Sequence, residues 1–342
     1  MSPIDPSPHA RGASPSFEAA LNEERPRLLA HCYRMLGSLP DADDAVQETL
    51  LRAHRRLDSF EGRSSLGTWL HGIATRVCLD MLAERKRRER AMDMGPAGDT
   101  ESPLVEVAAE RWLEPIPDAL VLPAAAGPEA RAEIRQRIRL AYVAALQHLP
   151  PRQRAALLLT EVVGFSAAET AELLETTVPA IHSALQRARA TLARRAPSPA
   201  PAERTEEQLR LVERFADAFE RYDMEALTAL LREDATMSMP PYALWLRGPR
   251  DIAAWMTGRG AACRGSRLVP TRANGAPAFG QYKPGPEPGR YEPWALVVLE
   301  VGESAIEGLT FYLDTARFFP RFGLPAHLRD DRRPIAVPKE DR

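Results

Sequence analysis

The pattern of apolar and polar positions between residues 41 and 90 predicts two amphipathic helices joined by a polar turn. In both helices the apolar or small side chains recur at steps of three and four residues, which places them on one face. These positions are Ala42, Ala45, Val46, Thr49, Leu50, Ala53 and Leu57 in the first helix, and Leu66, Trp69, Leu70, Ile73, Val77 and Met81 in the second. The sequence FEGRSS (60–65) between them is too polar to continue either helix. Another helix is predicted from Phe17 to Gly37.

A second helical region is predicted from residue 131 to 195. The apolar spacing indicates one helix through residues 134–149 and another that breaks at Gly164. Ser166 and Glu169 have the spacing of a capping box at the start of a short helix. The last helix carries on its apolar face Val178, Ile181, Leu185, Ala188 and Leu192. Two helices joined by a short turn indicate a helix-turn-helix, in which the second helix enters the major groove of DNA.

The segments outside these helices differ in composition. Residues 91–130 hold eight acidic residues against Arg111 alone and four prolines from position 115 to 128, which predicts an acidic linker without a helix of ordinary length. Residues 196–204 form a second Pro-rich linker. We expect residues 1–15 to be a disordered leader and residues 329–342 a disordered tail.

The pattern of residues 205–328 is that of an α+β domain. Two helices are predicted around Asp223 and a short one at PRDIAAWMTG (249–258). Strands are predicted at TMSMPP (236–241), at ALWLRG (243–248) and in the β-rich segments that follow residue 266. Helices followed by strands indicate a curved antiparallel sheet with helices at one side.

Composition changes this picture in two ways. The formal net charge of −2 hides an uneven distribution, because residues 131–195 carry ten arginines against five glutamates. The three cysteines, Cys32, Cys78 and Cys263, match no metal-ligand or redox spacing, which favours buried thiols in a reducing compartment. Because no signal peptide and no run of about 18 apolar residues is present, we expect a cytoplasmic protein without membrane contact.

Three stretches of the chain resemble known families. The sequence DADDAVQETL (41–50), with the loop and basic helix after it, resembles region 2 of the extracytoplasmic-function type of bacterial sigma factor. The sequence LPPRQRAALLLTEVVGFSAAETAELL (149–174), followed by SALQRAR (183–189), resembles region 4 of the same family. The C-terminal stretches MPPYALWLRG (239–248) and NGAPAFGQY (274–282) resemble the SnoaL-like branch of the nuclear-transport-factor-two-like (NTF2-like) cone fold.

The resemblance implies a multidomain protein. All-α sigma region 2 would span residues 16–90, and an all-α helix-turn-helix region 4 residues 131–195, followed by an α+β NTF2-like cone domain at 205–328. It also implies an alternative sigma factor that binds core RNA polymerase through the beta-prime clamp and the beta flap. Such a protein recognises and melts promoter DNA and needs no cofactor or metal. In this family the linker corresponding to residues 91–130 threads toward the RNA exit path.

The polymerase-binding face implied by the resemblance consists of Asp43, Asp44, Gln47 and Glu48. Acidic residues in a first helical turn also serve as caps and interact with the helix dipole. The alternative of a metal or acid–base site is therefore disfavoured for the trio of Asp41, Asp43 and Asp44. A solvated helix face would have the same composition, so it is the wider match that favours polymerase binding.

The promoter-contacting residues are predicted from their chemistry. Phe60 lies outside the apolar stripe and suits contact with an extruded base, and the neighbouring polar loop suits pockets for such bases. In region 2 the predicted DNA-binding residues are Phe60, Arg63, Ser64, Ser65, Thr68, His71, Arg76, Arg85, Lys86, Arg87 and Arg88. Gln and Arg bond bidentately to adenine and guanine edges in the major groove. In region 4 the predicted set is Thr176, Thr177, Ala180, Ser183, Gln186, Arg187 and Arg189.

The C-terminal domain is expected to regulate in cis, by folding back on the sigma domains. Enzymes of the SnoaL-like branch use a histidine–aspartate pair, whereas the only histidine here beyond residue 182 is His327, so we expect no catalysis. Aromatic side chains that could line a pocket, although such residues more often form core, are Tyr242, Trp245, Trp255, Tyr282 and Phe311. A ligand-sensing or enzymatic SnoaL-like protein with a DNA-binding half is the main alternative, and an ordinary helix-turn-helix repressor is another. The presence of an anti-sigma partner and the oligomeric state stay open.

Overall fold

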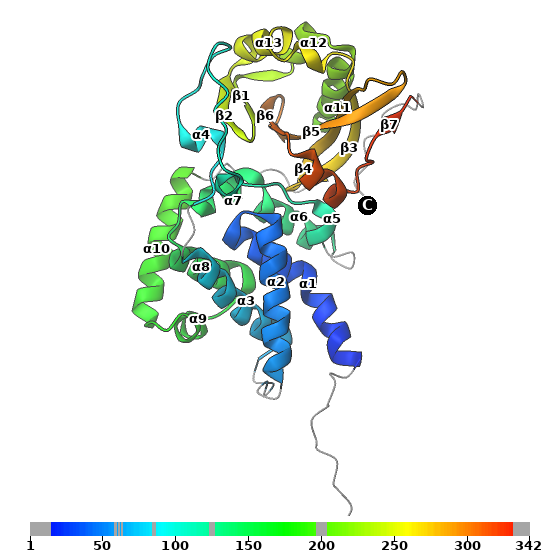
Figure 1. Cartoon of the computed structure of the whole chain (residues 1–342). Helices are drawn as coiled ribbons and strands as arrows, with labels where there is room; N and C mark the ends of the chain where they lie inside the picture. Colours follow the sequence, from blue (N-terminus) through cyan, green and yellow to red (C-terminus); the bar gives the residue numbers. More distant parts are fainter. Residues whose placement is uncertain are drawn as a thin grey trace, which may run out of the picture.

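The computed structural model describes residues 15–57, 60, 62, 64–83, 87–122, 127–195 and 204–330. Residues 1–14 of the predicted leader (1–15), most of the second linker (196–203) and nearly all of the predicted tail (331–342) therefore lie outside the described residues, whereas Pro15 begins α1. Two groups of helices lie below an α/β domain, with the N-terminal helices in blue and the C-terminal domain in yellow to red (Figure 1).

The first group contains the three helices expected before residue 90. They are α1 (Pro15–Leu36), α2 (Leu39–Arg55) and α3 (Leu66–Leu82). Gly37, with φ of 71°, ends α1, because glycine adopts this left-handed conformation without a steric cost. Ser38 and Ser65 are the N-caps of α2 and α3, and their hydroxyl oxygens accept hydrogen bonds from the backbone N–H groups of Asp41 (3.4 Å) and Thr68 (3.1 Å).

The segment after this group contains only short turns of helix within residues 87–122: α4 (Ala91–Met94), η2 (Ala109–Arg111) and α5 (Asp118–Val121). The prediction that no helix of ordinary length fits here is confirmed for these residues. Part of the segment is nevertheless packed rather than solvated, because Trp112, Leu113 and Ile116 are buried. It passes beside β2 of the α/β domain, where it is drawn in cyan (Figure 1).

The second group contains α6 (Pro128–Ile138), α7 (Leu140–Gln147), α8 (Pro151–Leu158), η3 (Leu159–Val163), α9 (Ala167–Leu173) and α10 (Val178–Arg195). The capping box of Ser166 and Glu169 and the break at Gly164 are confirmed. The single helix predicted through residues 134–149 is wrong, because Arg139 is extended (φ −50°, ψ 135°) and separates α6 from α7. The carbonyl of Ile138 is thereby released from the helix and accepts a hydrogen bond from a distant side chain, described below.

The α/β domain begins with α11 (Glu206–Arg221) and α12 (Met224–Thr228), and Asp223 caps the second of these helices. The later helical elements are α13 (Pro249–Thr257), η4 (Ala261–Cys263), α14 (Thr315–Phe318) and η5 (Phe319–Phe322). The strands are β1 (Leu231–Met239), β2 (Tyr242–Arg247), β3 (Arg267–Ala273), β4 (Ala276–Pro284), β5 (Arg290–Val301), β6 (Ile306–Tyr312) and β7 (Leu328–Arg329). The α+β prediction is confirmed.

The described strands form one sheet in the order β2-β1-β6-β5-β4-β3, with β7 paired to β5. The expectation of an antiparallel sheet is wrong for one pair, since β1 runs parallel to β6. The remaining pairs are antiparallel. Sequence patterning does not reveal this pair, because it sets the faces of a strand and not which distant strand lies beside it.

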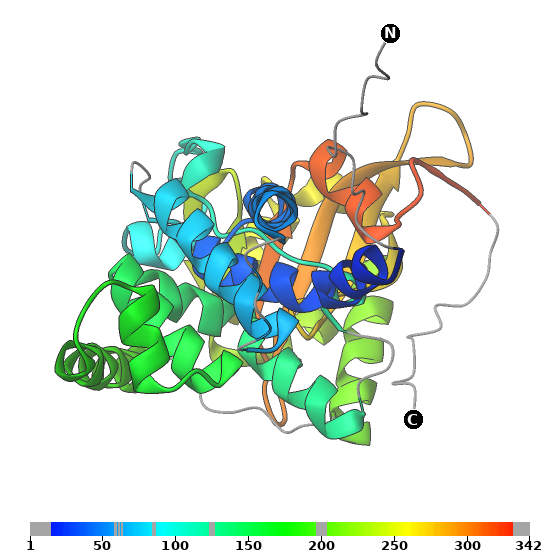
Figure 2. The same ribbon diagram turned by 90° about the horizontal axis from the view of Figure 1, so that it is seen from below.

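The sheet is buried on both faces, as the alternation along β5 shows. Leu296 and Val298 point into a core shared with the N-terminal helical groups, whereas Ala295, Val297 and Leu299 point into a core shared with α11 and α13. All five side chains are at most 1% exposed. Figure 1 shows α11–α13 on the far side of the sheet from the helical groups, and Figure 2, seen from below, shows those groups lying across the sheet. The α/β domain is thus docked against both helical groups.

Candidate polymerase and nucleic-acid interfaces

The four residues predicted to bind polymerase lie on α2, at steps that bring them to one side of the helix. Asp44 and Gln47 are exposed, and Glu48 forms an ion pair with Arg52 on the same helix (2.7 Å). Asp43 is paired differently: its carboxylate lies 2.6 Å from the guanidinium of Arg321 in η5. The C-terminal domain therefore reaches the predicted polymerase-binding face of α2.

The predicted base-contacting loop of region 2 is described in part, and Arg63, Arg85 and Lys86 lie outside the described residues. The ring of Phe60 lies 5.0 Å from that of Trp69, and Ser64 is exposed. The hydroxyl of Thr68 is 2.8 Å from that of Ser65, the cap of α3.

Arg76, farther along α3, is exposed, and its guanidinium lies 3.4 Å from a carbonyl oxygen of α9. The side of α3 that carries Arg76 is thus open to solvent, as are Ser64 and Ser65 before it. The opposite side of α3 packs into the helical core.

His71 lies in that core, not on the open side, which corrects the prediction that it faces a DNA strand. Its side chain is 7% exposed, Nδ1 lies 2.8 Å from the carbonyl oxygen of Gly67, and its ring meets that of His31 edge-on at 5.2 Å. Burial lowers the pKa of both histidines, so they are neutral in the folded protein. The sequence suggested one apolar stripe on α3, but α1, α2 and α8 together cover most of the helix.

Arg88 is a second correction, because it is 7% exposed and belongs to a buried ion-pair network. Its guanidinium donates to the carboxylate of Asp41 (2.7 Å) and to the carbonyl oxygen of Trp112 (2.8 Å), and it lies 3.7 Å from Glu114. Arg87 is exposed and pairs with Glu89 and with Nδ1 of His148. The basic run after α3 is therefore partly a structural junction between α2 and the linker.

The helix-turn-helix forms as predicted, with α9 and α10 joined by a turn in which Glu175 has a φ of 52°. The apolar positions Ile181, Leu185 and Ala188 are buried against the rest of the helical group. The predicted DNA-contacting residues are all exposed: Thr176, Thr177, Ala180, Ser183, Gln186, Arg187 and Arg189.

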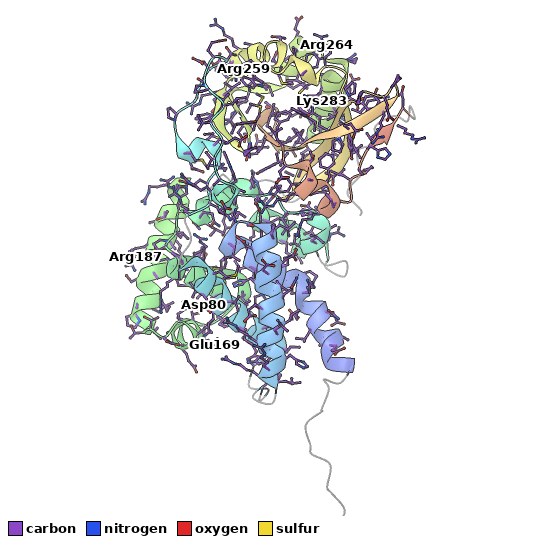
Figure 3. All side chains as sticks on the ribbon, in the orientation of Figure 1. Asp80, Glu169, Arg187, Arg259, Arg264 and Lys283 are labelled. Carbon is purple, nitrogen blue, oxygen red and sulfur yellow. The ribbon has the colours of Figure 1, made fainter. Side chains whose placement is uncertain are left out.

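Two contacts order this surface of α10. The guanidinium of Arg187 donates to the hydroxyl of Ser183 (2.6 Å), and that of Arg189 pairs with Glu161 (2.6 Å). Arg187 lies on the side of α10 that points away from the molecule (Figure 3). The side of α10 that carries Ser183, Gln186 and Arg187 is therefore polar and open to solvent.

Asn274 joins the C-terminal domain to α1, to the linker and to α6. The sequence did not single it out as a functional residue. It lies fully buried at the tip of the β3–β4 hairpin, with a φ of 55°. Its side-chain nitrogen donates to the hydroxyl oxygen of Tyr33 in α1 (2.7 Å) and to the carbonyl oxygen of Ile138 (2.6 Å), and its side-chain oxygen accepts from the N–H of Ile116 (3.0 Å). The Asn-Gly pair at 274–275 is a recognisable hairpin signal, but nothing local predicts these partners.

Two buried carboxylates of the linker strengthen the same junction. Glu114 is 2% exposed, accepts from the hydroxyl of Ser38 (2.7 Å) and pairs with Arg317 of α14 (2.6 Å). Asp118 is 4% exposed and accepts from the N–H of Gly275 (2.7 Å). Burial raises the pKa of both carboxyl groups, although neighbouring arginines oppose that shift.

The linker also pairs with β2, which is an edge strand of the sheet. The N–H of Val107 donates to the carbonyl oxygen of Pro241 (2.9 Å), and the N–H of Ala243 donates to that of Val105 (2.9 Å). The indole N–H of Trp245 donates to the carbonyl oxygen of Gly95 (3.0 Å). These bonds satisfy backbone groups that an uncovered edge would leave open.

The aromatic residues proposed to line a pocket in the cone do not converge on one site. Tyr242 lines a cavity beside the linker, and Trp245 bonds to the linker. The ring of Trp255 lies under the guanidinium of Arg259 (4.9 Å), which Figure 3 labels. The hydroxyl of Tyr282 donates to the carbonyl oxygen of Pro325.

The remaining aromatic residue, Phe311, stacks on Phe219 with ring centroids 6.3 Å apart. Phe215 and Phe279 belong to the same buried cluster, and their rings lie 6.4 Å apart. Phenylalanine side chains thus form a buried cluster between the sheet and α11. Across the part of the chain that the structure describes, no group of three or more His, Cys, Asp or Glu side chains is placed to hold a metal ion. None of the described helices combines the length and apolar character needed to cross a bilayer.

Comparison with known proteins matches each part of this architecture. Residues 21–88 match the family model of sigma-70 region 2, residues 139–192 that of sigma-70 region 4, and residues 212–290 that of a SnoaL-like domain. The chain is 42% identical to the ECF RNA polymerase sigma factor SigG of Mycobacterium tuberculosis over 330 residues, which cover 95% of this chain and 87% of the relative. It is 34% identical over 186 residues to SigM of the same organism, with 54% and 80% of the two chains covered.

Among solved structures, the crystal structure of the extracytoplasmic function sigma factor SigJ of Mycobacterium tuberculosis is similar with a TM-score of 0.57. The similarity covers 91% of this chain and 99% of that one, at 22% sequence identity. At that identity it supports the fold alone, namely two sigma regions followed by the C-terminal domain.

Proposed function

This chain belongs to the extracytoplasmic-function (ECF) family of RNA polymerase sigma factors, and on that premise we propose how its parts act. Region 2, built from α1–α3, would dock on core RNA polymerase and open promoter DNA. Region 4, built from α6–α10, would hold the distal promoter element. The C-terminal SnoaL-like domain would regulate both from within the same chain.

The exposed face of α10 supports the promoter-binding part of this proposal. Gln186 and Arg187 are the types that bond bidentately to adenine and guanine, and both are exposed beside the small residues Ala180 and Ser183. Small side chains permit close approach of the helix to the bases. Arg189 and the arginines at the end of α10 suit the phosphate backbone.

The exposed side of α2 supports polymerase binding through Asp43, Asp44, Gln47 and Glu48. We propose that this face meets the beta-prime clamp and that region 4 meets the beta flap. In this structure Arg321 pairs with Asp43 at 2.6 Å. This single contact carries the proposal of regulation in cis, since the C-terminal domain and the polymerase would compete for one carboxylate.

The packing inside the C-terminal domain favours a regulatory over a catalytic role. Phe215, Phe219, Phe279 and Phe311 are buried together as core between the sheet and α11. A general acid–base pair needs two titratable groups that face a common substrate. His327 is exposed and does not belong to the buried aromatic cluster.

Open-complex formation with core RNA polymerase tests the proposed function. The full chain is mixed with polymerase and a library of promoter fragments, and unpaired thymines are detected by permanganate. We expect strand opening that requires polymerase and this chain together. Binding to duplex DNA that ignores polymerase and opens nothing would contradict the proposal and would indicate a helix-turn-helix repressor instead.

A further inference from the structure

A cavity of about 340 Å³ lies where the linker meets the C-terminal domain, outside the filled cone. Four aromatic residues contribute to its walls: Trp112 comes from the linker, Tyr242 from β2, Tyr312 from the end of β6 and Phe318 from α14. Tyr312 and Phe318 meet edge-on, with ring centroids 5.5 Å apart. A volume of this size at a junction between two segments, with apolar walls and few polar groups, is typical of small-molecule sites.

Three charged residues line the same cavity, and their pairing leaves a negative charge at its edge. Arg317 pairs with the buried carboxylate of Glu114 (2.6 Å), so these two charges compensate each other. Arg88, the other cation near Glu114, makes its closer contact with Asp41 (2.7 Å against 3.7 Å). Asp314 is exposed, and it caps α14 by accepting from the N–H of Arg317 (3.2 Å). No cationic side chain other than Arg317 lines the cavity among the described residues.

We propose that this cavity binds a small organic cation with an apolar body. Aromatic rings attract a cation through their negative faces, and a carboxylate at the edge adds Coulomb attraction. The apolar body of the ligand would lie between Trp112, Tyr242 and Phe318, with its ammonium group toward Asp314. An anion of the same shape would be repelled by the carboxylate of Asp314, since the charge of Glu114 is compensated by Arg317, and would bind more weakly.

The site needs both the linker and the C-terminal domain, so it exists only while they are docked. A ligand that binds this arrangement alone stabilises it by mass action. The inference goes beyond regulation by direct contact between the domains, because a small molecule would then control how stably the C-terminal domain is docked. Ligand binding does not depend on polymerase. The chain could therefore fail to bind the ligand and still initiate transcription, or bind the ligand and fail to initiate.

Calorimetric titration of the full chain with two matched indoles tests the inference. Tryptamine carries an ammonium group and indole-3-propionate a carboxylate on the same ring system. We expect tryptamine to bind at one site, with an affinity of roughly millimolar or tighter for a ligand of this size, and indole-3-propionate to bind at least about tenfold more weakly. Equal affinity for the two indoles, or no binding of tryptamine, would overturn the proposal.

Three variants locate the site. Tyr242→Ala removes a wall and is expected to weaken tryptamine binding by about tenfold or more. Asp314→Asn keeps the ability to cap α14 but removes the charge, and a loss of several-fold in affinity is expected. Trp294→Ala is the control, because this exposed aromatic residue lies on β5 under Lys283, away from the cavity. If Asp314→Asn and Tyr242→Ala bound tryptamine as tightly as the control variant, tryptamine would bind elsewhere. That result would refute the assignment.

Discussion

The side-chain amide of Asn274 donates a hydrogen bond to the hydroxyl oxygen of Tyr33 at 2.7 Å, across 241 positions of the sequence. The hydroxyl of Tyr33 in turn donates to the carbonyl oxygen of Glu114 (2.6 Å). One buried chain of hydrogen bonds therefore runs from the tip of the C-terminal hairpin through α1 to the linker. Burial raises the pKa of Tyr33, which keeps its hydroxyl protonated and able to donate.

Replacing Asn274 is expected to loosen the C-terminal domain from the sigma domains. Asn274→Gly removes the amide but tolerates the φ of 55°, so it removes the hydrogen bonds without adding backbone strain. Leaving the N–H of Ile116 and the carbonyl of Ile138 unpaired in a buried site costs about 1–3 kcal/mol for each group that water does not reach. Hydrogen exchange should show faster exchange of the Ile116 amide.

Asn274→Ala provides the comparison, because it adds backbone strain to the same loss of hydrogen bonds. We expect Asn274→Ala to be less stable than Asn274→Gly in chemical denaturation. Unchanged exchange at Ile116 in both variants would mean that Asn274 does not hold the linker in place.

Reversing the charge of Arg321 is expected to favour polymerase binding. The pair with Asp43 is partly exposed, so Arg321→Glu should change the free energy of unfolding by at most about 1 kcal/mol. The new glutamate would repel Asp43 and leave its carboxylate without this partner, and the affinity for core polymerase should rise. Arg232→Glu is the matched control, since Arg232 pairs with Asp234 and Glu307 within the C-terminal domain. Equal polymerase affinity for both variants would argue against competition at Asp43.

Arg88 and Arg87 are expected to behave very differently although they are adjacent. Arg88→Met leaves Asp41 and Glu114 without their shared buried cation, and removal of one partner from a buried ion pair typically costs about 3–5 kcal/mol. Arg87 is 41% exposed in its side chain, so Arg87→Met should cost less than about 1 kcal/mol. Urea denaturation of the two variants checks this difference. A similarly small loss of stability in both variants would contradict the buried ion pairs of Arg88 and would favour a solvated arginine that faces DNA.

Much of the fold could be predicted because it depends on local patterns. The spacing of Ile181, Leu185 and Ala188 predicted both the existence of α10 and the face that it exposes, and the pair of Ser166 and Glu169 predicted where α9 begins. In each case the determining interactions lie within a few residues of one another. The predicted DNA-contacting residues of α10 are exposed for the same reason.

The docking of the domains could not be predicted, because it depends on partners far apart in the sequence. Whether Arg88 is solvated is decided by Asp41, 47 positions away, and the break at Arg139 accompanies the bond between Ile138 and Asn274, 136 positions away. One local signal was present. The run WALVVLEV (294–301) is apolar without alternation, which is typical of a strand buried on both faces.

Substitutions on α10 should separate base recognition from backbone binding. Arg187→Ala and Gln186→Ala are each expected to weaken binding to the distal promoter element by about 1–3 kcal/mol and to relax the preference at one base pair. Arg194→Ala, at the end of α10, should weaken binding to all sequences alike and reduce its salt dependence. Binding of variant promoters by the polymerase holoenzyme at several salt concentrations distinguishes these outcomes. Uniform weakening by all three variants would mean that α10 reads no base.

The stability of region 2 should fall as the pH drops below about 6.5, the ordinary value for histidine. His31 and His71 have pKa values lowered by burial, so in this range the unfolded chain takes up protons that the folded chain does not. Each histidine then reduces stability by about 1.4 kcal/mol per pH unit, down to its own lowered pKa. Above pH 6.5 both are neutral in either state and the effect vanishes. Denaturation curves between pH 5 and 7.5 measure the slope.

His31→Gln should reduce this slope, whereas His54→Gln, at an exposed position on α2, should leave it unchanged. The two buried carboxyl groups of the junction act in the opposite sense. The pKa values of Glu114 and Asp118 are raised, so the folded chain binds the extra protons, and stability falls as the pH rises through those values. Any increase in stability on acidification should therefore survive His31→Gln and diminish in Glu114→Gln. If instead His31→Gln left the acid-side loss unchanged, His31 would not contribute to that loss, and protonation of another group would have to account for it.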